Sequence, residues 1–271
     1  MTSLSEQPNN AIILGMPCSG IRVTAAIFAR QGYFLVSDAT VEAHSGDEYN
    51  PSDRSEAMRL VEHNATLLRR SGFRRHNTWL FDRVTDQQTE SLRTMRPTPE
   101  DHAFAADCAA RRPWLWSDSR LCYTLAYWWR LIDQENTRVL VLQRRPEETW
   151  KDFLHLGWRD DTKANRADVL SRIDHHLDAA MLCIERHRIP HLVVHYDQFL
   201  AAPATTAARI GQVFGLSLAA DDLGVHAMGE DKLLNSVRFA QRISALNNTE
   251  QPLAANVIQV DGMSTNRDIA R

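Results

Sequence analysis

Short apolar runs alternate with longer segments of helical periodicity along most of the chain. The runs Ile12–Leu14, Arg138–Gln143 and Leu192–Val194 are typical of buried strands, and Trp114–Trp116 is a further strand candidate. The segments with apolar residues at three-to-four spacing are 23–30, 56–68, 99–111, 121–131, 147–157, 166–187 and 204–214. This alternation predicts an α/β fold in which helices flank a central parallel sheet.

The two ends of the chain differ from its middle in composition. Residues 1–10 are polar and predict a flexible N-terminal tail, and residues 247–271 predict an irregular C-terminal segment. Residues 11–246 carry the strand and helix patterns without an internal repeat or a low-complexity linker, which predicts a single α/β domain. Residues 36–55 are rich in Asp, Ser, Gly, Asn and Pro and predict a long loop.

The overall composition narrows the class of protein. Of the 271 residues, 44% are apolar and 24% are charged, and the net charge is -3, so no global positive field attracts nucleic acid or anionic lipid. No apolar run approaches the roughly 20 residues that a membrane span needs, so we expect no span. Four cysteines without a C-x-x-C spacing, and no secretory signal in residues 1–10, favour free thiols and a cytoplasmic protein.

We expect no metal site from the histidines. His187, His191 and His195 are four residues apart, but Pro190 separates the first two. On the predicted strand, His191 and His195 would lie roughly 13 Å apart, too far to share one zinc ion.

A glycine-bracketed turn is the strongest chemical signal in the chain. Gly15 ends the first apolar run, and Gly20 precedes a helical pattern, so the frame G-x-x-x-x-G lies between a strand and a helix. Backbone N–H groups in such a turn can hold a phosphate. The residues predicted to contact the anion are Gly15, Met16, Pro17, Cys18, Ser19, Gly20, Ile21 and Arg22. The alternative reading of the same frame is an ordinary turn.

The residues after Gly20 limit which anion the turn can take. Ile21 and Arg22 stand where a nucleotide kinase or GTPase has Lys and Ser or Thr, which argues against a magnesium-bound nucleoside triphosphate. Arg144 follows directly after another predicted strand. Because parallel strands present their carboxyl ends at one edge of the sheet, Arg144 and the turn can face one ligand.

Five segments resemble motifs of the sulfotransferase family, above all its bacterial branch, in the family's order between about Ile12 and Leu216. The family patterns are G-x-P-[R/K]-S-G, N-P-x-G-[Y/H]-[F/W]-E, W-K-D-P-R, R-x-P-(x)5-S and Y-E-D-L-L-x-D-P. The matching segments are Gly15–Gly20, Asn50-Pro51 with Glu56, Trp116–Arg120, Arg138–Asp152, and Tyr196–Leu200 with Pro203.

This resemblance implies a sulfotransferase fold, related to P-loop nucleotide hydrolases, and a specific reaction. The donor would be 3′-phosphoadenosine 5′-phosphosulfate (PAPS), and the acceptor a hydroxyl or amine of a carbohydrate, lipid or small metabolite, with no metal. Glu56 would be the base that takes the acceptor's proton, and Arg22 the cation near the leaving phosphate. Arg144 and the position of Asp152 would hold the donor's 3′-phosphate. The acceptor site would be built by variable loops, here 36–55 and 217–240.

The departures from the family patterns concentrate at the donor site. Cys18 replaces Arg or Lys, Ile21 and Arg22 replace Thr or Ser, Ser117 replaces Lys, and Asp152 replaces Ser. A carboxylate at position 152 repels a phosphate dianion unless a cation such as Arg22 or Arg145 neutralises it. A second hypothesis is therefore a weak or inactive relative that binds a nucleotide or a protein. A P-loop kinase is the third.

Two further groups have structural interpretations. Asp118 and Arg120 are predicted to form a structural ion pair. Tyr123, Tyr127 and the Trp128-Trp129 pair are predicted to pack in the core.

Overall fold

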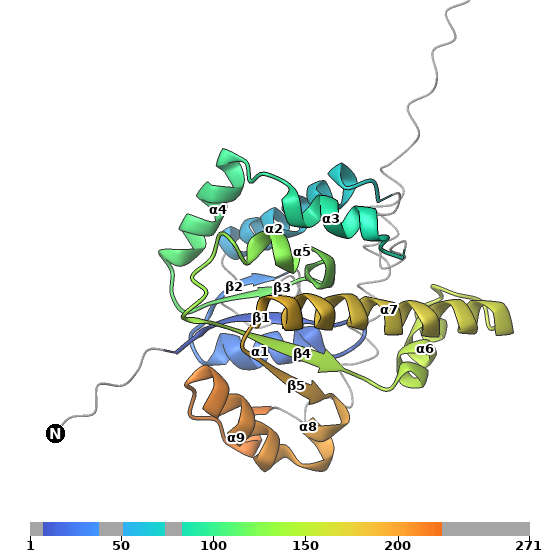
Figure 1. Ribbon diagram of the computed structural model, residues 1–271. Helices are drawn as coiled ribbons and strands as arrows, with labels where there is room; N and C mark the ends of the chain where they lie inside the picture. The colour runs from blue at the N-terminus through green and yellow to red at the C-terminus, as the bar shows by residue number, and fades with distance from the viewer. Residues whose placement is uncertain (1–7, 38–50, 74–82, 224–271) are drawn as a thin grey trace, which may run out of the picture.

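A five-stranded, all-parallel sheet forms the centre of the molecule (Figure 1). The computed structural model describes residues 8–37, 51–73 and 83–223, with the side chains of 51–58 excepted. The strand order is β2-β3-β1-β4-β5. The strands are β1 (Asn10–Leu14), β2 (Phe34–Ser37), β3 (Trp114–Ser117), β4 (Thr137–Gln143) and β5 (His191–His195). The predicted α/β class with a central parallel sheet is confirmed.

Helices cover both faces of this sheet, as Figure 1 shows. They are α1 (Ile21–Arg30), α2 (Pro51–Arg70), α3 (Asp86–Thr94), α4 (Pro99–Ala109), α5 (Leu121–Trp128), α6 (Pro146–His155), α7 (Lys163–His187), α8 (Asp197–Ala201) and α9 (Pro203–Phe214), followed by the 3-10 turn η2 (Ala220–Leu223). Alternate residues of β1 enter different layers, as the two-residue period of a strand requires. Ile12 and Leu14 pack with the layer of α2, α5 and α7, whereas Ile13 packs with that of α1 and α9.

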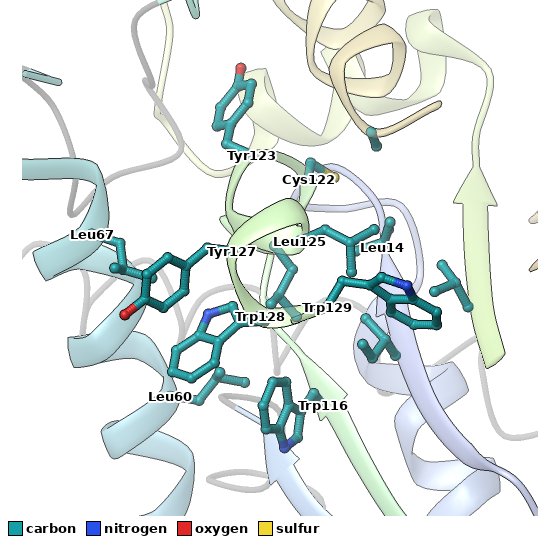
Figure 2. Packing of buried hydrophobic residues seen from close by; sticks show 14 of the residues in the cluster. Leu14, Leu60, Leu67, Trp116, Cys122, Tyr123, Leu125, Tyr127, Trp128 and Trp129 are labelled. Atoms are coloured by element: carbon teal, nitrogen blue, oxygen red, sulfur yellow. The ribbon is translucent and has the colours of Figure 1, made fainter. Parts of the chain in front are cut away.

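The predicted aromatic core is confirmed on the α2–α5 side of the sheet. Tyr127 and Trp128 are fully buried, Trp129 is 5% exposed, and the Trp128 ring packs edge-on against Trp116 with the ring centroids 5.2 Å apart (Figure 2). Burial of aromatic rings of this size is a main source of folding free energy. This layer anchors α5 directly behind the carboxyl end of β3.

A buried asparagine fastens α2 to this layer. The Asn64 Nδ2 donates to Asp118 Oδ2 at 2.8 Å, and its Oδ1 accepts from Thr124 Oγ1 at 2.8 Å and from Trp128 Nε1 at 2.7 Å. Asp118 in turn pairs with Arg120 at 2.8 Å, so the predicted structural ion pair is confirmed. Because buried polar groups are costly when unpaired, these bonds hold α2 in one position relative to β3 and α5.

Four segments differ from the sequence-based expectations, one of them the short helix α8, which was not predicted. Strand β2 includes Val36 and Ser37, which were expected to begin a long loop, because a short edge strand gains its pairing from β3. Helix α2 begins at Pro51 rather than at Glu56, and proline suits the first helical turn because the N–H it lacks there would have no intrahelical partner. Helix α3 has no counterpart among the predicted helices.

The predicted domain boundaries are only partly covered by the described residues. The domain was expected to begin at residue 11, but β1 begins at Asn10, and the Asn9 N–H donates to the Phe214 carbonyl at 3.0 Å. Residues 1–7 and the C-terminal segment 247–271 lie outside the described residues, as does most of the loop 36–55.

Candidate functional site: the anion loop and Arg144

The segment Gly15–Gly20, here called the anion loop, connects β1 to α1 at the carboxyl edge of the sheet. Cys18 and Gly20 have positive φ angles of 65° and 97°, and the Ser19 N–H donates to the Met16 carbonyl at 3.1 Å. These angles fold the loop back over the start of α1. The first N–H groups of a helix lack intrahelical acceptors, so α1 offers donors and the positive end of its dipole to this loop.

The Ser19 hydroxyl is a buried polar group that has no partner among the described residues. Ser19 is 2% exposed, and its Oγ makes no hydrogen bond to any described residue. Buried hydroxyls are nearly always hydrogen-bonded, so this group is available to a water molecule or a ligand. Its position between two glycines at a helix start fits the oxygen atoms of a phosphate or sulfate ester.

Both glycines of the loop are required by close packing. A Cβ on Gly15 would lie 2.5 Å from Ser19 Oγ and 3.1 Å from the Leu142 carbonyl oxygen. A Cβ on Gly20 would lie 2.2 Å from the ring of Tyr196. The loop is therefore clamped between β4 and the segment that follows β5, which keeps its N–H groups in place.

The remaining loop residues anchor it on the other side. Met16 is buried and packs with Trp150, Phe153, Val169 and Ile173, which lie on α6 and α7. Pro17 and Cys18 are half-buried, and Ile21 opens α1 beside Gly15. The rigid support from two helices limits how far the loop can move to admit a ligand.

Arg144 is brought to the anion loop, as its position after β4 predicts. Its Nη1 donates to the Cys18 carbonyl oxygen at 2.5 Å and forms an ion pair with the Asp152 carboxylate. The guanidinium also lies over the Tyr196 ring, 5.6 Å from its centroid. The Arg144 side chain is only 7% exposed, so this cation is packed against the loop.

The partner of Asp152 differs from the expectation. Arg22 and Arg145 were the expected neutralising cations, but the carboxylate pairs with Arg144 itself. Arg145 instead pairs with Asp197 at 2.7 Å. The reason is the helical path of α6, which returns residue 152 to the strand end while Arg145 points outward with 68% of its side chain exposed.

The remaining residues that the sequence singled out lie on three different elements. Glu56 lies in the second turn of α2, and its side chain lies outside the described residues. Arg22 is the second residue of α1 and is half-buried near the anion loop. Ser117 ends β3 and is fully buried.

Two residues of the site carry no assigned role in the sequence prediction. Tyr196 packs on Gly20 and under Arg144. It begins the motif segment Tyr196–Leu200, so the sequence pointed to this residue without giving it a role. Cys122 lies beneath the loop, where its thiol is hydrogen-bonded to the Gly15 backbone. Burial raises the pKa of this thiol to about 12, so it stays protonated at neutral pH. No sequence pattern identifies such a contact.

Within the described parts of the chain, no group of three or more His, Cys, Asp or Glu side chains is arranged to hold a metal ion. Among the helices formed by those same residues, none is long and apolar enough to cross a bilayer.

Comparison with known proteins gives a distant structural likeness. No protein-family model matches the chain, and no curated protein matches its sequence. The fold is similar to the sulfotransferase domain from the Synechococcus PCC 7002 olefin synthase, with 14% sequence identity and a TM-score of 0.43 over 80% of this chain and 77% of that one. The assignment of a function therefore rests on the residues of this chain.

Proposed function

We propose that the chain is a sulfotransferase that transfers a sulfuryl group from PAPS to a hydroxyl or amine of a carbohydrate, lipid or small metabolite. The observation that carries this proposal is the Ser19 hydroxyl, which is buried without a described partner inside a glycine-bracketed loop at the start of α1. The order of the motif segments from Gly15 to Pro203 resembles that of sulfotransferases, and this resemblance is the reason for proposing PAPS as the donor.

The anion loop and Arg144 would divide the donor between them. Ser19 and the N–H groups at the start of α1 would hold the phosphosulfate, because these donors are fixed by the packing of Gly15 and Gly20. Arg144 would hold the 3′-phosphate after exchanging Asp152 for the ligand. The Asp152 carboxylate would therefore compete with the 3′-phosphate for Arg144.

In the proposed transfer step, Glu56 and Arg22 have one role each. The bond between sulfur and the donor phosphate oxygen breaks while the bond from sulfur to the acceptor oxygen or nitrogen forms. Glu56 takes the proton that the acceptor loses, and Arg22 stabilises the charge that develops on the leaving phosphate. The proposal needs no metal ion, because Arg22, Arg144 and the N-terminus of α1 supply positive charge.

A second candidate is a binding module that holds the nucleotide or a partner protein without transfer. The ion pair between Arg144 and Asp152 favours it, since the cation expected on the 3′-phosphate is already neutralised. We further propose a cytoplasmic location and no nucleic-acid partner. All four cysteines are free, and the net charge is -3.

A thermal-shift experiment on the full chain separates these candidates. We expect adenosine 3′,5′-bisphosphate to stabilise the protein and magnesium-ATP to have no effect. At about 100 times Kd a ligand stabilises by ~2.7 kcal/mol, which raises Tm by about 5–10 °C for a domain of this size. A shift with magnesium-ATP alone would indicate a kinase. A shift with the bisphosphate but no transfer of labelled sulfate from PAPS to a panel of acceptors would favour the binding module.

A further inference from the structure

A cavity of about 440 Å³ lies between α3, α5 and α7. Its volume is within the range of small-molecule sites in proteins. Helix α5 forms its floor with Cys122, Tyr123 and Ala126, and residues of α3 and α7 form its walls. Figure 1 shows these three helices on the same side of the sheet. None of the residues predicted to contact a ligand lines this cavity, and Cys122, which also contacts the Gly15 backbone, is the lining residue that it shares with the support of the anion loop.

The cavity follows α3 and α7, which run in the same direction. Arg83, just before α3, hydrogen-bonds to Ser171 near the start of α7, whereas Arg93 at the end of α3 influences the pKa of His187 at the end of α7. His175 and His187 both line the cavity and are twelve helical residues apart. At 1.5 Å per residue they lie about 18 Å apart along the helix axis.

Each end of the cavity carries a histidine with a ring nitrogen that has no partner among the described residues. The Nε2 atoms of His175 and His187 are buried and have no hydrogen-bond partner among the described residues. Neighbouring His176 shows the contrast, since its Nε2 is bonded to the Ser119 carbonyl at 2.8 Å. A molecule with a polar group at each end would satisfy both nitrogens.

The two ends differ in charge. Burial lowers the pKa of His187, and the cations Arg186, Arg93 and Arg130 lower it further, so the neutral ring lies in a positive field. Glu185 is the acidic residue that lines this end. The field there favours an anionic ligand group, which could accept a hydrogen bond from His187.

The other end and the middle have a different chemistry. Asp178, one turn from His175, and Asp86 at the start of α3 line the end near His175, where a hydroxyl or amine fits better than an anion. Between the two ends the wall includes Ala179 and Leu182. Leu182 is 53% exposed, which places an apolar side chain at the surface beside the cavity.

We propose that this cavity binds an elongated organic molecule with an apolar middle, a carboxylate at the His187–Arg186 end and a hydroxyl or amine at the His175 end. The proposal does not depend on sulfuryl transfer. It goes beyond the proposed function, because it assigns a ligand to a cavity that no predicted site residue lines.

The test uses calorimetry on the full chain with two probes below their aggregation concentrations. These are 12-hydroxydodecanoate and the neutral 1,12-dodecanediol. We expect the hydroxy acid to bind, and the Arg186→Gln variant to bind it about 3- to 10-fold more weakly with no change for the diol. Arg188→Gln makes the same charge change two residues away, outside the lining residues, and should leave both probes unaffected.

A steric test locates the bound probe. Ala179→Phe fills the cavity from α7 and should abolish binding of both probes; Ala126→Phe fills it from α5 and serves as the second variant if the first does not fold. Retained binding in a folded variant of either kind would overturn the proposal. So would failure of the hydroxy acid to bind the unmodified chain, or equal losses in Arg186→Gln and Arg188→Gln. None of these outcomes bears on adenosine bisphosphate binding at the anion loop.

Discussion

Arg144 contacts two acceptors that belong to the same site, the Cys18 carbonyl of the anion loop and the Asp152 carboxylate. Both contacts use Nη1, and Asp152 is 34% exposed, so the carboxylate is the partner that a ligand from solvent can displace. Under the proposed function, a 3′-phosphate on Arg144 would compete with this carboxylate for the same cation.

This competition predicts opposite effects for the two residues. Asp152→Asn should bind adenosine 3′,5′-bisphosphate at least tenfold more tightly, and Arg144→Ala should bind it ten- to hundredfold more weakly, since a charged hydrogen bond contributes about 1.5–3 kcal/mol. Calorimetry measures both affinities. Asp161→Asn, at an exposed position, is the charge-matched control and should leave the affinity unchanged. If Asp152→Asn binds the bisphosphate no more tightly than the unmodified chain, Arg144 is not the residue that holds the 3′-phosphate.

The two glycines with similar φ angles allow a second test of the loop. Gly20 and Gly32 have φ angles of 97° and 82°, so an alanine at either position costs about 1–2 kcal/mol for the left-handed backbone. Only at Gly20 would the new Cβ also meet a neighbour, the Tyr196 ring at 2.2 Å. Gly20→Ala should therefore lower the free energy of unfolding by about 1–3 kcal/mol more than Gly32→Ala, measured in urea. Equal losses would mean that Tyr196 does not clamp the loop.

At the scale of elements, helix α7 carries a buried titratable group at its centre. His176 is 2% exposed, and its Nε2 contacts the Ser119 carbonyl beyond the end of β3. Burial lowers its pKa from 6.5 to about 4, with a smaller effect from His175, so the folded protein holds the ring neutral. The contact joins α7 to the same sheet edge that bears the anion loop.

This shift predicts a pH dependence of stability. Between about pH 6.5 and pH 4 the unfolded chain binds a proton at this residue and the folded chain does not. The contribution of His176 is therefore present above about pH 6.5 and is lost as the pH falls toward 4, by ~3 kcal/mol in total. Urea unfolding across this range should be flatter for His176→Gln than for the unmodified chain. The exposed His195→Gln variant should keep the original slope; a slope unchanged in His176→Gln would contradict the assignment.

The elements that sequence analysis predicted share a physical basis. Strands β1, β3 and β4 are buried on both faces, so they appear as unbroken apolar runs. Edge strand β2 has only four residues and precedes a polar segment, so its short apolar pattern did not predict a strand. Helix α3 buries only Leu92 and has no apolar stripe. Its one signal was the Thr85–Gln88 capping box, which a search for periodicity does not detect.

At the scale of the whole molecule, the site is assembled from segments that are distant in the chain. The anion loop, Arg144 and Tyr196 follow β1, β4 and β5, which are neighbours in the sheet, so a parallel arrangement brings them to one edge. The positions of the loop and Arg144 could therefore be predicted from the strands. The pairing of Arg144 with Asp152, and the contact of Cys122 with Gly15, could not, because they depend on how side chains pack after the elements meet.

Helix α2 and helix α1 supply the two groups proposed for the transfer step, and each should leave a different kinetic signature. Glu56→Gln should lower turnover about 10²- to 10⁴-fold, the usual contribution of a general base, with donor affinity unchanged because Glu56 would face the acceptor. Arg22→Ala should lower both turnover and donor affinity, because it would contact the donor before and during the transfer.

Steady-state assays of sulfate transfer, combined with calorimetry of adenosine 3′,5′-bisphosphate, measure both quantities for each variant. Arg30→Ala, at the exposed end of α1, is the matched control for Arg22→Ala and should change neither. If Glu56→Gln and Arg22→Ala bind the bisphosphate as the unmodified chain does and lose no turnover, the base and the leaving-group cation are other residues. Asn64 anchors α2 against the end of β3 through Asp118. The search for the base would then continue among the groups at that strand end.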